Sequence, residues 1–151
     1  MRVSAKSDYA IRAAVELAAA GDGPVKGDRI AKSQSIPSNF LENILADLRN
    51  AGIVSSRRGA EGGYWLARPA DEVSLADVIR AVDGPLANVR GVRSDQLAYE
   101  GSAEALADVW IAVRASLRGV LEHVSLADVA RGELADHVRQ LAADPEAWAP
   151  H

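Results

Sequence analysis

The chain has 151 residues, of which 48% are hydrophobic, a net charge of −4 and no cysteine. This length predicts one domain with a substantial hydrophobic core, and the lack of cysteine excludes disulfides, thiol catalysis and cysteine-ligated zinc or iron–sulfur sites. No apolar run approaches the length of a membrane span and no hydrophobic signal segment opens the chain, so we expect a soluble cytoplasmic protein.

The charges are divided unevenly along the chain. Residues 1–69 hold ten lysines and arginines against seven acidic residues, whereas residues 70–151 hold seven against fourteen. A mildly basic first part and a strongly acidic second part favour contact of one face only with phosphate. A solvated acidic surface without such a role is the alternative, and charge alone does not separate the two.

The first predicted elements are helices at about residues 8–20, 27–34 and 38–50. Ser7 is a plausible N-cap for the first helix, whose apolar residues recur at helical spacing. A tight turn around Ser35–Pro37 leads to the third helix, for which Ser38 is the expected N-cap and Gly52 the closing residue.

The helix over 38–50 has an apolar side and a polar side. The side chains expected to pack inward are Phe40, Leu41, Ile44, Leu45 and Leu48. Asn39, Glu42 and Asn43 point the other way near the start of the helix. Polar side chains of these types are suited to hydrogen bonds with base edges in DNA.

A β-hairpin is expected next, from Ile53 to Arg68. Its tip is rich in glycine (Gly59, Gly62 and Gly63), which permits positive φ, and the adjacent arginines Arg57 and Arg58 lie at the end of its first strand. Two helices joined by a tight turn and followed by such a hairpin are typical of a winged helix-turn-helix. DNA is therefore the leading candidate ligand.

The remaining elements are mostly helical. Ser74 and Asp77 predict a capped helix start, and the same five residues, Ser-Leu-Ala-Asp-Val, return at 125–129. Residues 84–101 are expected to be irregular, a long helix is expected at 102–124, and a short one at 133–142. The long helix carries a heptad stripe made of Leu106, Trp110, Val113, Leu117, Val120 and Val124.

The stripe has two explanations. It can pack on the core of its own domain, or two copies can bury it against each other, which would give the two-fold symmetry that palindromic operators require. We prefer the dimer. The expected fold is thus mainly α with a small β-hairpin wing: a winged helix-turn-helix domain at 1–83, a loop at 84–101, a dimerisation helix at 102–124 and a helical tail at 125–151.

This pattern resembles the IscR/NsrR/CymR family of bacterial winged-helix regulators, also called the Rrf-two family. The resemblance covers about residues 1–130, and the order and spacing of its motifs carry it. The matching residues are Met1-Arg2-Val3, Lys6, Tyr9-Ala10, Ile30-Ala31, Phe40-Leu41-Glu42, Leu48-Arg49, Ala51-Gly52, Arg58-Gly59, Gly62-Gly63-Tyr64, Leu66-Ala67, Asp77-Val78-Ile79, Gly84-Pro85-Leu86, Trp110 and Leu126-Ala127-Asp128.

The resemblance implies a homodimer that binds a roughly palindromic operator, usually as a repressor. It places the helix over 38–50 in the major groove, Glu42 against a cytosine-containing base pair, and Arg58 in the minor groove. The expected DNA-binding residues are Arg2, Lys6, Ser38, Asn39, Glu42, Asn43, Arg57 and Arg58. Each has an ordinary alternative as a solvated surface residue, and Glu61 at the hairpin tip departs from the uncharged residue expected near phosphate.

The larger departure lies in residues 84–101. Iron–sulfur members carry three cluster-binding cysteines in this loop and the adjoining helix start, and here the loop has neither cysteine nor histidine. Asp8 matches a carboxylate ligand of some relatives, but one carboxylate cannot hold a cluster. His123, His137 and His151 lie outside the loop. We therefore expect no cofactor, no metal and no cluster-based sensing.

Control by a small molecule or by a partner protein is the remaining expectation. An anion could pair with Arg90 and Arg93 near the loop, although ordinary surface arginines explain them as well. A partner could instead clamp the dimer, as in the cysteine-metabolism branch of the family. A protein-interaction module that has lost specific DNA binding is the alternative function. An enzyme is not expected, because the sequence has no nucleophile–base–acid set and no phosphate-binding loop before a helix.

Overall fold

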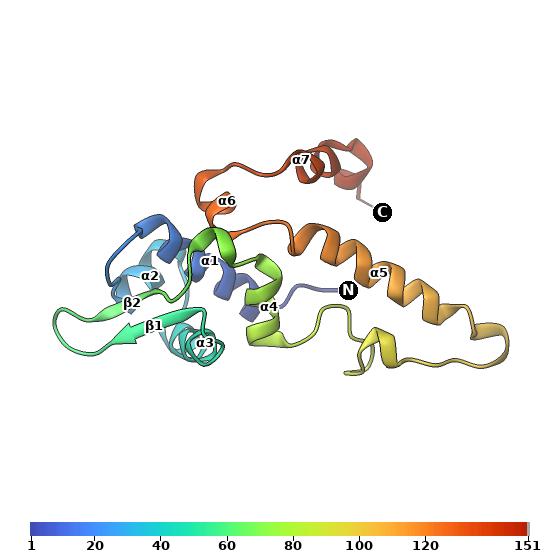
Figure 1. Ribbon diagram of the computed structural model, residues 1–151, viewed down its shortest axis with the longest axis horizontal. Coiled ribbons are helices and arrows are strands. Elements are labelled where there is room, and N and C mark those ends of the chain that lie inside the picture. The colour runs from blue at the N-terminus through green and yellow to red at the C-terminus, as the bar shows by residue number, and fades with distance from the viewer. Residues whose placement is uncertain (151) are drawn as a thin grey trace.

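Residues 1–150 are described by the computed structural model, and they form a helical body with a hairpin at one end and a long arm at the other (Figure 1). The sheet has only the two antiparallel strands of the hairpin. The helices are α1 (Ala5–Ala20), α2 (Gly27–Gln34), α3 (Ser38–Asn50), α4 (Leu75–Asp83), α5 (Leu106–Leu121), α6 (Leu126–Arg131) and α7 (Asp136–Ala143), and the strands are β1 (Val54–Arg57) and β2 (Gly63–Leu66).

Helix α1 lies at the centre of the body. Its residues Ala10, Ala13, Ala14 and Leu17 are at most 1% exposed, and the helix contacts α2, α3, α4, α6 and β2. Methyl side chains let the surrounding helices approach α1 closely. The largest buried side chains of α3, among them Leu41 and Leu48, join the same core.

The start of α1 differs from the expectation. Ser4, not Ser7, is the N-cap, and its hydroxyl accepts a hydrogen bond from the Ser7 N–H at 2.9 Å. Ser7 is 1% exposed, and its Oγ donates to Asp83 Oδ2 at 2.6 Å. Both serines have the chemistry of a cap, and both hydroxyls donate to Asp83 at the end of α4, Ser4 from the cap position and Ser7 from the first turn of the helix.

Two copies of one hexapeptide, Val73–Val78 and Val124–Val129, lie side by side. In each copy the serine caps a helix and forms a capping box with the aspartate three residues later, as expected for Ser74 and Asp77. The Leu75 N–H donates to the Val124 carbonyl and the Leu126 N–H to the Val73 carbonyl, both at 2.9 Å. This antiparallel bridge holds α6 on α1, where Leu126 is fully buried.

The long helix of the arm, α5, is shorter than the helix expected over 102–124. A 3₁₀ turn at Gly101–Ala103 precedes α5, which begins at Leu106 and ends at Leu121. Gly101 has φ 61° and the Glu104 N–H bonds the Gly101 carbonyl, so the chain is still turning where Ser102 was expected to start the helix. At the other end, Val124 lies in the bridge to Leu75 and not in the helix.

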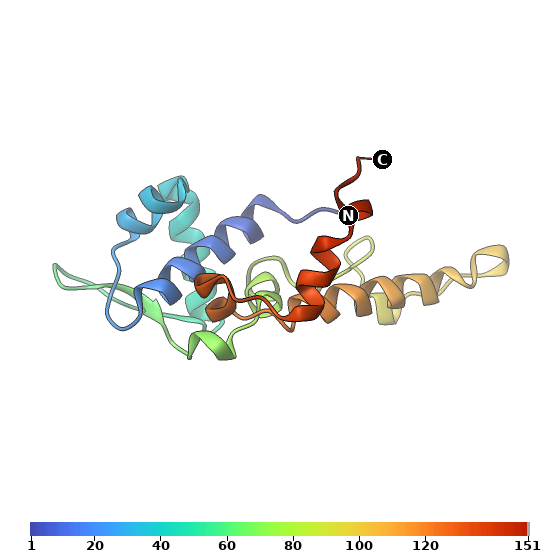
Figure 2. The ribbon, with the colours of Figure 1, turned by 90° about the horizontal axis from the view of Figure 1, so that it is seen from above.

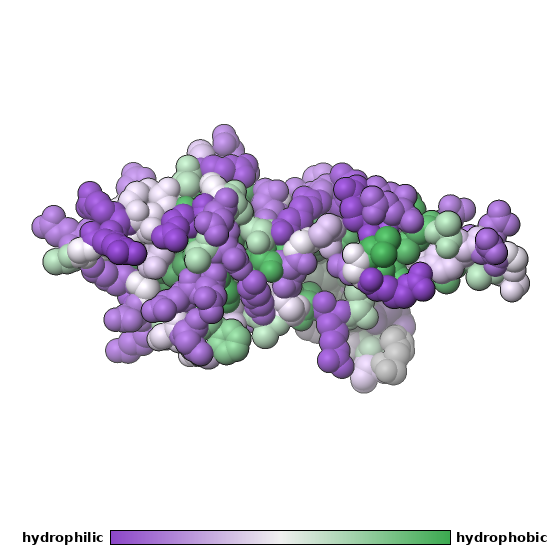
Figure 3. Space-filling model, turned by 90° about the horizontal axis from the view of Figure 1, so that it is seen from below, coloured by the Kyte–Doolittle hydropathy of each residue, from purple (hydrophilic) through white to green (hydrophobic). Residues whose placement is uncertain are grey.

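The body and the arm give the molecule an elongated shape. Seen from above, α5 and the loop before it extend away from the body, and α7 lies beyond α6 near the C-terminus (Figure 2). Hydrophilic residues cover most of the face in Figure 3, and hydrophobic residues gather at the surface of the arm. Among residues 1–150, every helix is too short or too polar to traverse a lipid bilayer.

Candidate nucleic-acid interface

The turn between α2 and α3 sets the direction of α3. Ser35 ends α2 in the left-handed conformation with φ 52°, and the Ile36 N–H returns to the Ala31 carbonyl at 2.9 Å. Arg12 of α1 donates to the Gln34 carbonyl at 2.6 Å, which satisfies one of the free carbonyls at the end of α2. The turn before α3 is therefore fixed by a backbone hydrogen bond to α2 and by a side-chain hydrogen bond from α1.

Helix α3 exposes the four polar residues expected to contact DNA. Ser38, Asn39, Glu42 and Asn43 are all exposed, whereas Leu41, Ile44, Leu45 and Leu48 are at most 2% exposed. Asn43 Nδ2 donates to the Asn39 carbonyl at 3.3 Å. Ser38 is the first residue of the helix and not its cap, because Pro37 occupies the cap position without a side-chain hydrogen bond.

Phe40 contradicts its expected inward packing. Its side chain is 54% exposed on α3. The ring meets Tyr9 of α1 edge to face, with centroids 6.3 Å apart, and the Arg12 guanidinium lies 4.9 Å from the centroid of the Tyr9 ring. The reason is the helical spacing: the buried residues of α3 centre on another side, which leaves Phe40 at the border of the apolar face.

The hairpin β1–β2 with its tip, residues 54–66, is called the wing below. Its register pairs Val54 with Leu66 and Arg57 with Gly63. Gly62 and Gly63 are required by close backbone approach, because a Cβ at Gly62 would lie 2.0 Å from the Arg57 carbonyl oxygen and one at Gly63 2.6 Å from that of Val25.

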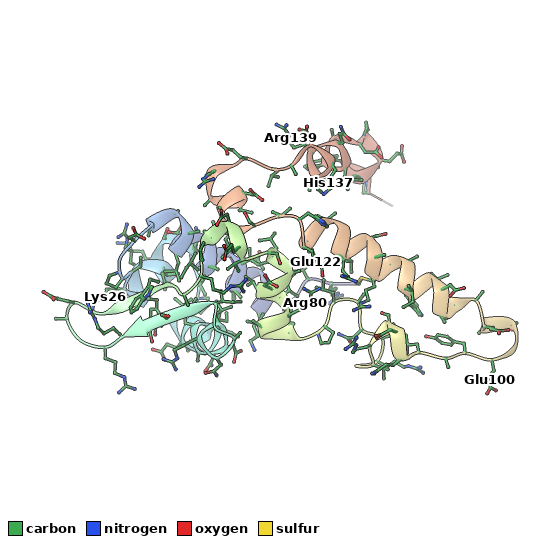
Figure 4. All side chains as sticks on the ribbon, in the orientation of Figure 1. Lys26, Arg80, Glu100, Glu122, His137 and Arg139 are labelled. Atoms are coloured by element: carbon green, nitrogen blue, oxygen red, sulfur yellow. The ribbon has the colours of Figure 1, made fainter. Side chains whose placement is uncertain are left out.

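The wing is fastened to the start of α2. Val25 and Tyr64 exchange two backbone hydrogen bonds of 2.8 Å, and Lys26 Nζ donates to the Gly59 carbonyl at 2.7 Å. Figure 4 shows Lys26 beside the wing. Sequence reasoning missed this lysine, although a basic residue directly before a short helix of a helix-turn-helix was a visible signal.

The two arginines of the wing differ in their surroundings. Both are exposed. Arg57 donates to the Glu61 carbonyl at 3.2 Å and so braces the tip. Within residues 1–150 no protein group bonds the side chain of Arg58, whose guanidinium is available to a ligand.

A groove lies between α2 and α3, beside Tyr64 of the wing. Its lining includes Lys26 and Asp28 at the start of α2, Ser38 and Glu42 on α3, and Tyr64 on β2. The structure thus brings Ser38 and Glu42 into one surface with the base of the wing. Asn43 lies on the other flank of α3, beside Lys6 and Phe40.

The two N-terminal candidates, Arg2 and Lys6, do not line this groove. Arg2 is exposed before α1. Lys6 Nζ lies 2.7 Å from Asp47 Oδ2, and the two side chains are 40% and 37% exposed. This exposed ion pair joins α1 to the C-terminal half of α3, and it engages the ammonium group that was expected to contact the DNA backbone.

The predicted stripe of α5 is only partly covered. Leu106, Trp110, Val113, Leu117 and Val120 are half-buried, and Trp110 Nε1 donates to Tyr99 Oη in the loop at 3.0 Å. Val124 is 3% exposed and belongs to the bridge with Leu75, not to the stripe. Val109 and Ile111, which the stripe omits, are 50% and 41% exposed.

Ion pairs connect the arm to the body. Glu122, just after α5, accepts hydrogen bonds from Arg118 of α5 and Arg80 of α4, and these lower the pKa of its carboxyl to about 2. Arg80 and Glu122 point toward each other in Figure 4.

In the loop, Arg93 makes two hydrogen bonds to Asp95, of 3.0 and 2.7 Å, and these lower the pKa of Asp95. Arg93 is therefore already paired, and Arg90 lies exposed at a turn with φ 54°.

Metal-ligating chemistry does not gather in residues 1–150. No three histidine, aspartate or glutamate side chains there are placed to hold a metal ion. The rings of His123 and His137 meet edge to face with centroids 5.9 Å apart, and His137 Nε2 lies 3.1 Å from the Gly119 carbonyl. Asp8 pairs with Arg12 at 2.9 Å, and His151 lies outside the described residues.

Comparisons with known proteins agree on one class. The family described as "Rrf2: Iron-dependent Transcriptional regulator" matches residues 3–132. Rv1287 of Mycobacterium tuberculosis strain H37Rv, provisionally named an HTH-type transcriptional regulator, is 56% identical over 145 residues, which are 95% of this chain and 90% of that protein. The HTH-type transcriptional regulator CymR of Bacillus subtilis is 34% identical over 131 residues, which are 86% and 90% of the two chains.

Solved structures give the same result. CymR, the global cysteine regulator of B. subtilis, superposes with a TM-score of 0.74 at 32% identity and covers 87% of this chain and 98% of its own. IscR of T. potens superposes with a TM-score of 0.71 at 33% identity over 99% and 97% of the two chains. The expected fold class, mainly helical with a hairpin wing, is confirmed.

Proposed function

Because the chain belongs to the Rrf2 family of transcriptional regulators, we propose that it is a dimeric, sequence-specific DNA-binding protein, a cytoplasmic repressor that works without an iron–sulfur cluster. The family and its named relatives are regulators of transcription and not enzymes. One observation carries the proposal: exposed Ser38 and Glu42 of α3 share a groove with the base of the wing.

Each part of this surface has a distinct role in the proposal. Asn39, Glu42 and Asn43 read base edges in the major groove, where a glutamate accepts from the cytosine amino group. Arg58 enters the minor groove or contacts phosphate, since no protein group holds it within residues 1–150. Ser38, Arg57, Arg2 and Lys6 contact the phosphate backbone and fix the position of the protein without reading sequence.

The dimer contact is proposed along α5. Val109 is a half-exposed apolar residue next to the stripe on an arm that leaves the body, and the stripe from Leu106 to Val120 is only partly covered. Pairing two arms would bury this surface and set two copies of α3 about a two-fold axis. Val109→Asp and Leu117→Asp should each shift sedimentation from dimer to monomer, whereas Leu141→Asp, exposed on α7, should leave the dimer intact. A dimer that survives both arm variants would rule out this contact.

The family description names iron dependence, and the residues of this chain do not fit an iron–sulfur cluster. Clusters are held by cysteine thiolates, with histidine in some cases, and this chain has no cysteine. Its signal is proposed to be a small molecule or a partner protein. A mostly apolar cavity lined by Val3, Ile79, Leu86 and Leu117 lies where the N-terminal segment, α4, the loop and α5 meet. Asp83 and Arg2 also line it, and a ligand there would contact the N-terminal segment, the end of α4 and α5 of the arm.

In vitro selection from a pool of random duplexes tests the proposal. The metal-free protein should enrich one duplex, and binding of that duplex should fall steeply with salt because phosphate contacts release counterions. Arg58→Ala should weaken the enriched complex by about 1–3 kcal/mol. Arg139→Ala, exposed on α7 and paired with Asp136, is the matched control and should bind like the unchanged protein. If no duplex is enriched, the interaction-module function replaces this one.

A further inference from the structure

An aromatic ring on the proposed recognition helix is left half-exposed by the fold. Phe40 is 54% exposed, although burying a phenylalanine is worth about 1.5–3 kcal/mol. The other large apolar residues of α3 are at most 2% exposed. We infer that Phe40 is a specificity-determining residue whose ring contacts the C5 methyl group of a thymine in the major groove. This inference rests on the proposed function.

The ring is held in place rather than free. Tyr9 supports it edge to face at 6.3 Å between centroids, and Arg12 in turn lies over the ring of Tyr9. Arg12 is anchored by Asp8 and by the Gln34 carbonyl. A side chain that is already oriented loses little conformational entropy on contact with a ligand.

The neighbours of Phe40 define where it would meet DNA. Asn43, three residues later, lies on the same side of α3, and a surface depression contains Phe40, Asn43 and Lys6. In the proposed complex Asn43 contacts base edges and Lys6 contacts phosphate. Phe40 therefore lies between a base contact and a backbone contact. The thymine methyl is the apolar group of the major groove, and it projects from the base toward the strand's own backbone.

The polar surroundings favour DNA over a protein partner. Lys6, Asn43 and Asp47 line the depression that contains the ring, and no second large apolar side chain of α3 is exposed. A protein-binding surface would need a broader apolar patch at its centre. One ring among polar groups matches one methyl group among polar base edges.

Replacing thymine by uracil removes this methyl group and keeps every base-pair hydrogen bond. The probe is the enriched duplex described above, with each thymine replaced in turn. The unchanged protein should bind about threefold to fivefold more weakly at one position in each half-site, as expected for exposing one methyl group. Phe40→Ala should bind the thymine and uracil duplexes equally, Phe40→Leu should keep part of the difference, and Leu141→Ala should keep all of it.

The possible results distinguish failure of the inference about Phe40 from failure of the proposed DNA-binding function. Enrichment followed by equal binding of all uracil duplexes overturns the inference alone, and so does a thymine preference that persists in Phe40→Ala. Failure to enrich any duplex overturns the proposed function and this inference with it. Because Phe40 is half-exposed, circular dichroism should show that both Phe40 variants are folded.

Discussion

The ion pair between Lys6 and Asp47 makes a sharp prediction about affinity. If Lys6 contacts phosphate in the complex, it must leave Asp47, which lies 2.7 Å away in the free protein. Side chains that are 40% and 37% exposed form a pair worth about 0.2–1 kcal/mol. Asp47→Asn removes this competition, so the enriched duplex should bind up to about fivefold more tightly near 0.1 M salt, where charges still act over about 10 Å.

Fluorescence anisotropy titrations over a range of salt concentrations measure this effect. Lys6→Gln should make the slope of log affinity against log salt shallower by about 0.9, the value for one lost phosphate contact. Asp47→Asn should then give little further gain in the Lys6→Gln protein. Asp136→Asn, which opens an exposed ion pair on α7, is the matched control and should leave DNA binding unchanged.

Two results would refute the reasoning. An unchanged salt slope in a folded Lys6→Gln protein would show that Lys6 does not contact phosphate. A full gain that persists without Lys6 would show that Asp47 acts by repelling DNA directly.

Three further variants test the fold. Leu126→Ala should lower the free energy of unfolding by about 2–5 kcal/mol, because the leucine is fully buried, whereas Leu75→Ala in the other hexapeptide should lower it less. Urea unfolding at one fixed protein concentration compares the two variants, and equal losses would contradict the packing of α6. Gly62→Ala should distort the wing and weaken DNA binding as Arg58→Ala does, while Gly119→Ala, with open space around it, should not; anisotropy titrations decide. Glu122 has a folded-state pKa of about 2, below its ordinary value, so its contribution to stability is present above pH 4.5 and is lost as the pH falls toward 2. Thermal melts of Glu122→Gln at several pH values should lack this part of the acid dependence. Identical pH profiles of the variant and the unchanged protein would contradict the pairing of Glu122 with Arg118 and Arg80.

Local signals in the sequence predicted most of the body. Helices at 27–34 and 38–50 were placed correctly because a tight turn, a cap region and periodic leucines all agree there. The two capping boxes were also visible, since in each a serine and an aspartate three residues apart bond each other's backbone. Such features depend on neighbours in the chain, and a single sequence shows them.

Long-range contacts account for the errors. Periodicity alone put Phe40 inside, because a residue at the edge of an apolar stripe is buried only if a neighbouring helix reaches it, and here only the edge of Tyr9 does. Ser7 was taken for a cap because its bond to Asp83 cannot be seen locally. Val124 continued the heptad stripe in the sequence, yet the bridge to Leu75 takes it out of the helix. The expected contacts with DNA stay predictions.

The packing of α6 on α1 also bears on how the chain is made. Translation proceeds from the N-terminus, so α1 leaves the ribosome early and waits for α6, more than a hundred residues later, to cover Leu17 and its neighbours. Only four residues separate the end of α5 from the start of α6, so the last part of the core is made near the end of the chain. The body that holds α3 and the wing is therefore complete only when nearly the whole chain has been made, and a chain that stops before α6 would leave part of that core open to solvent.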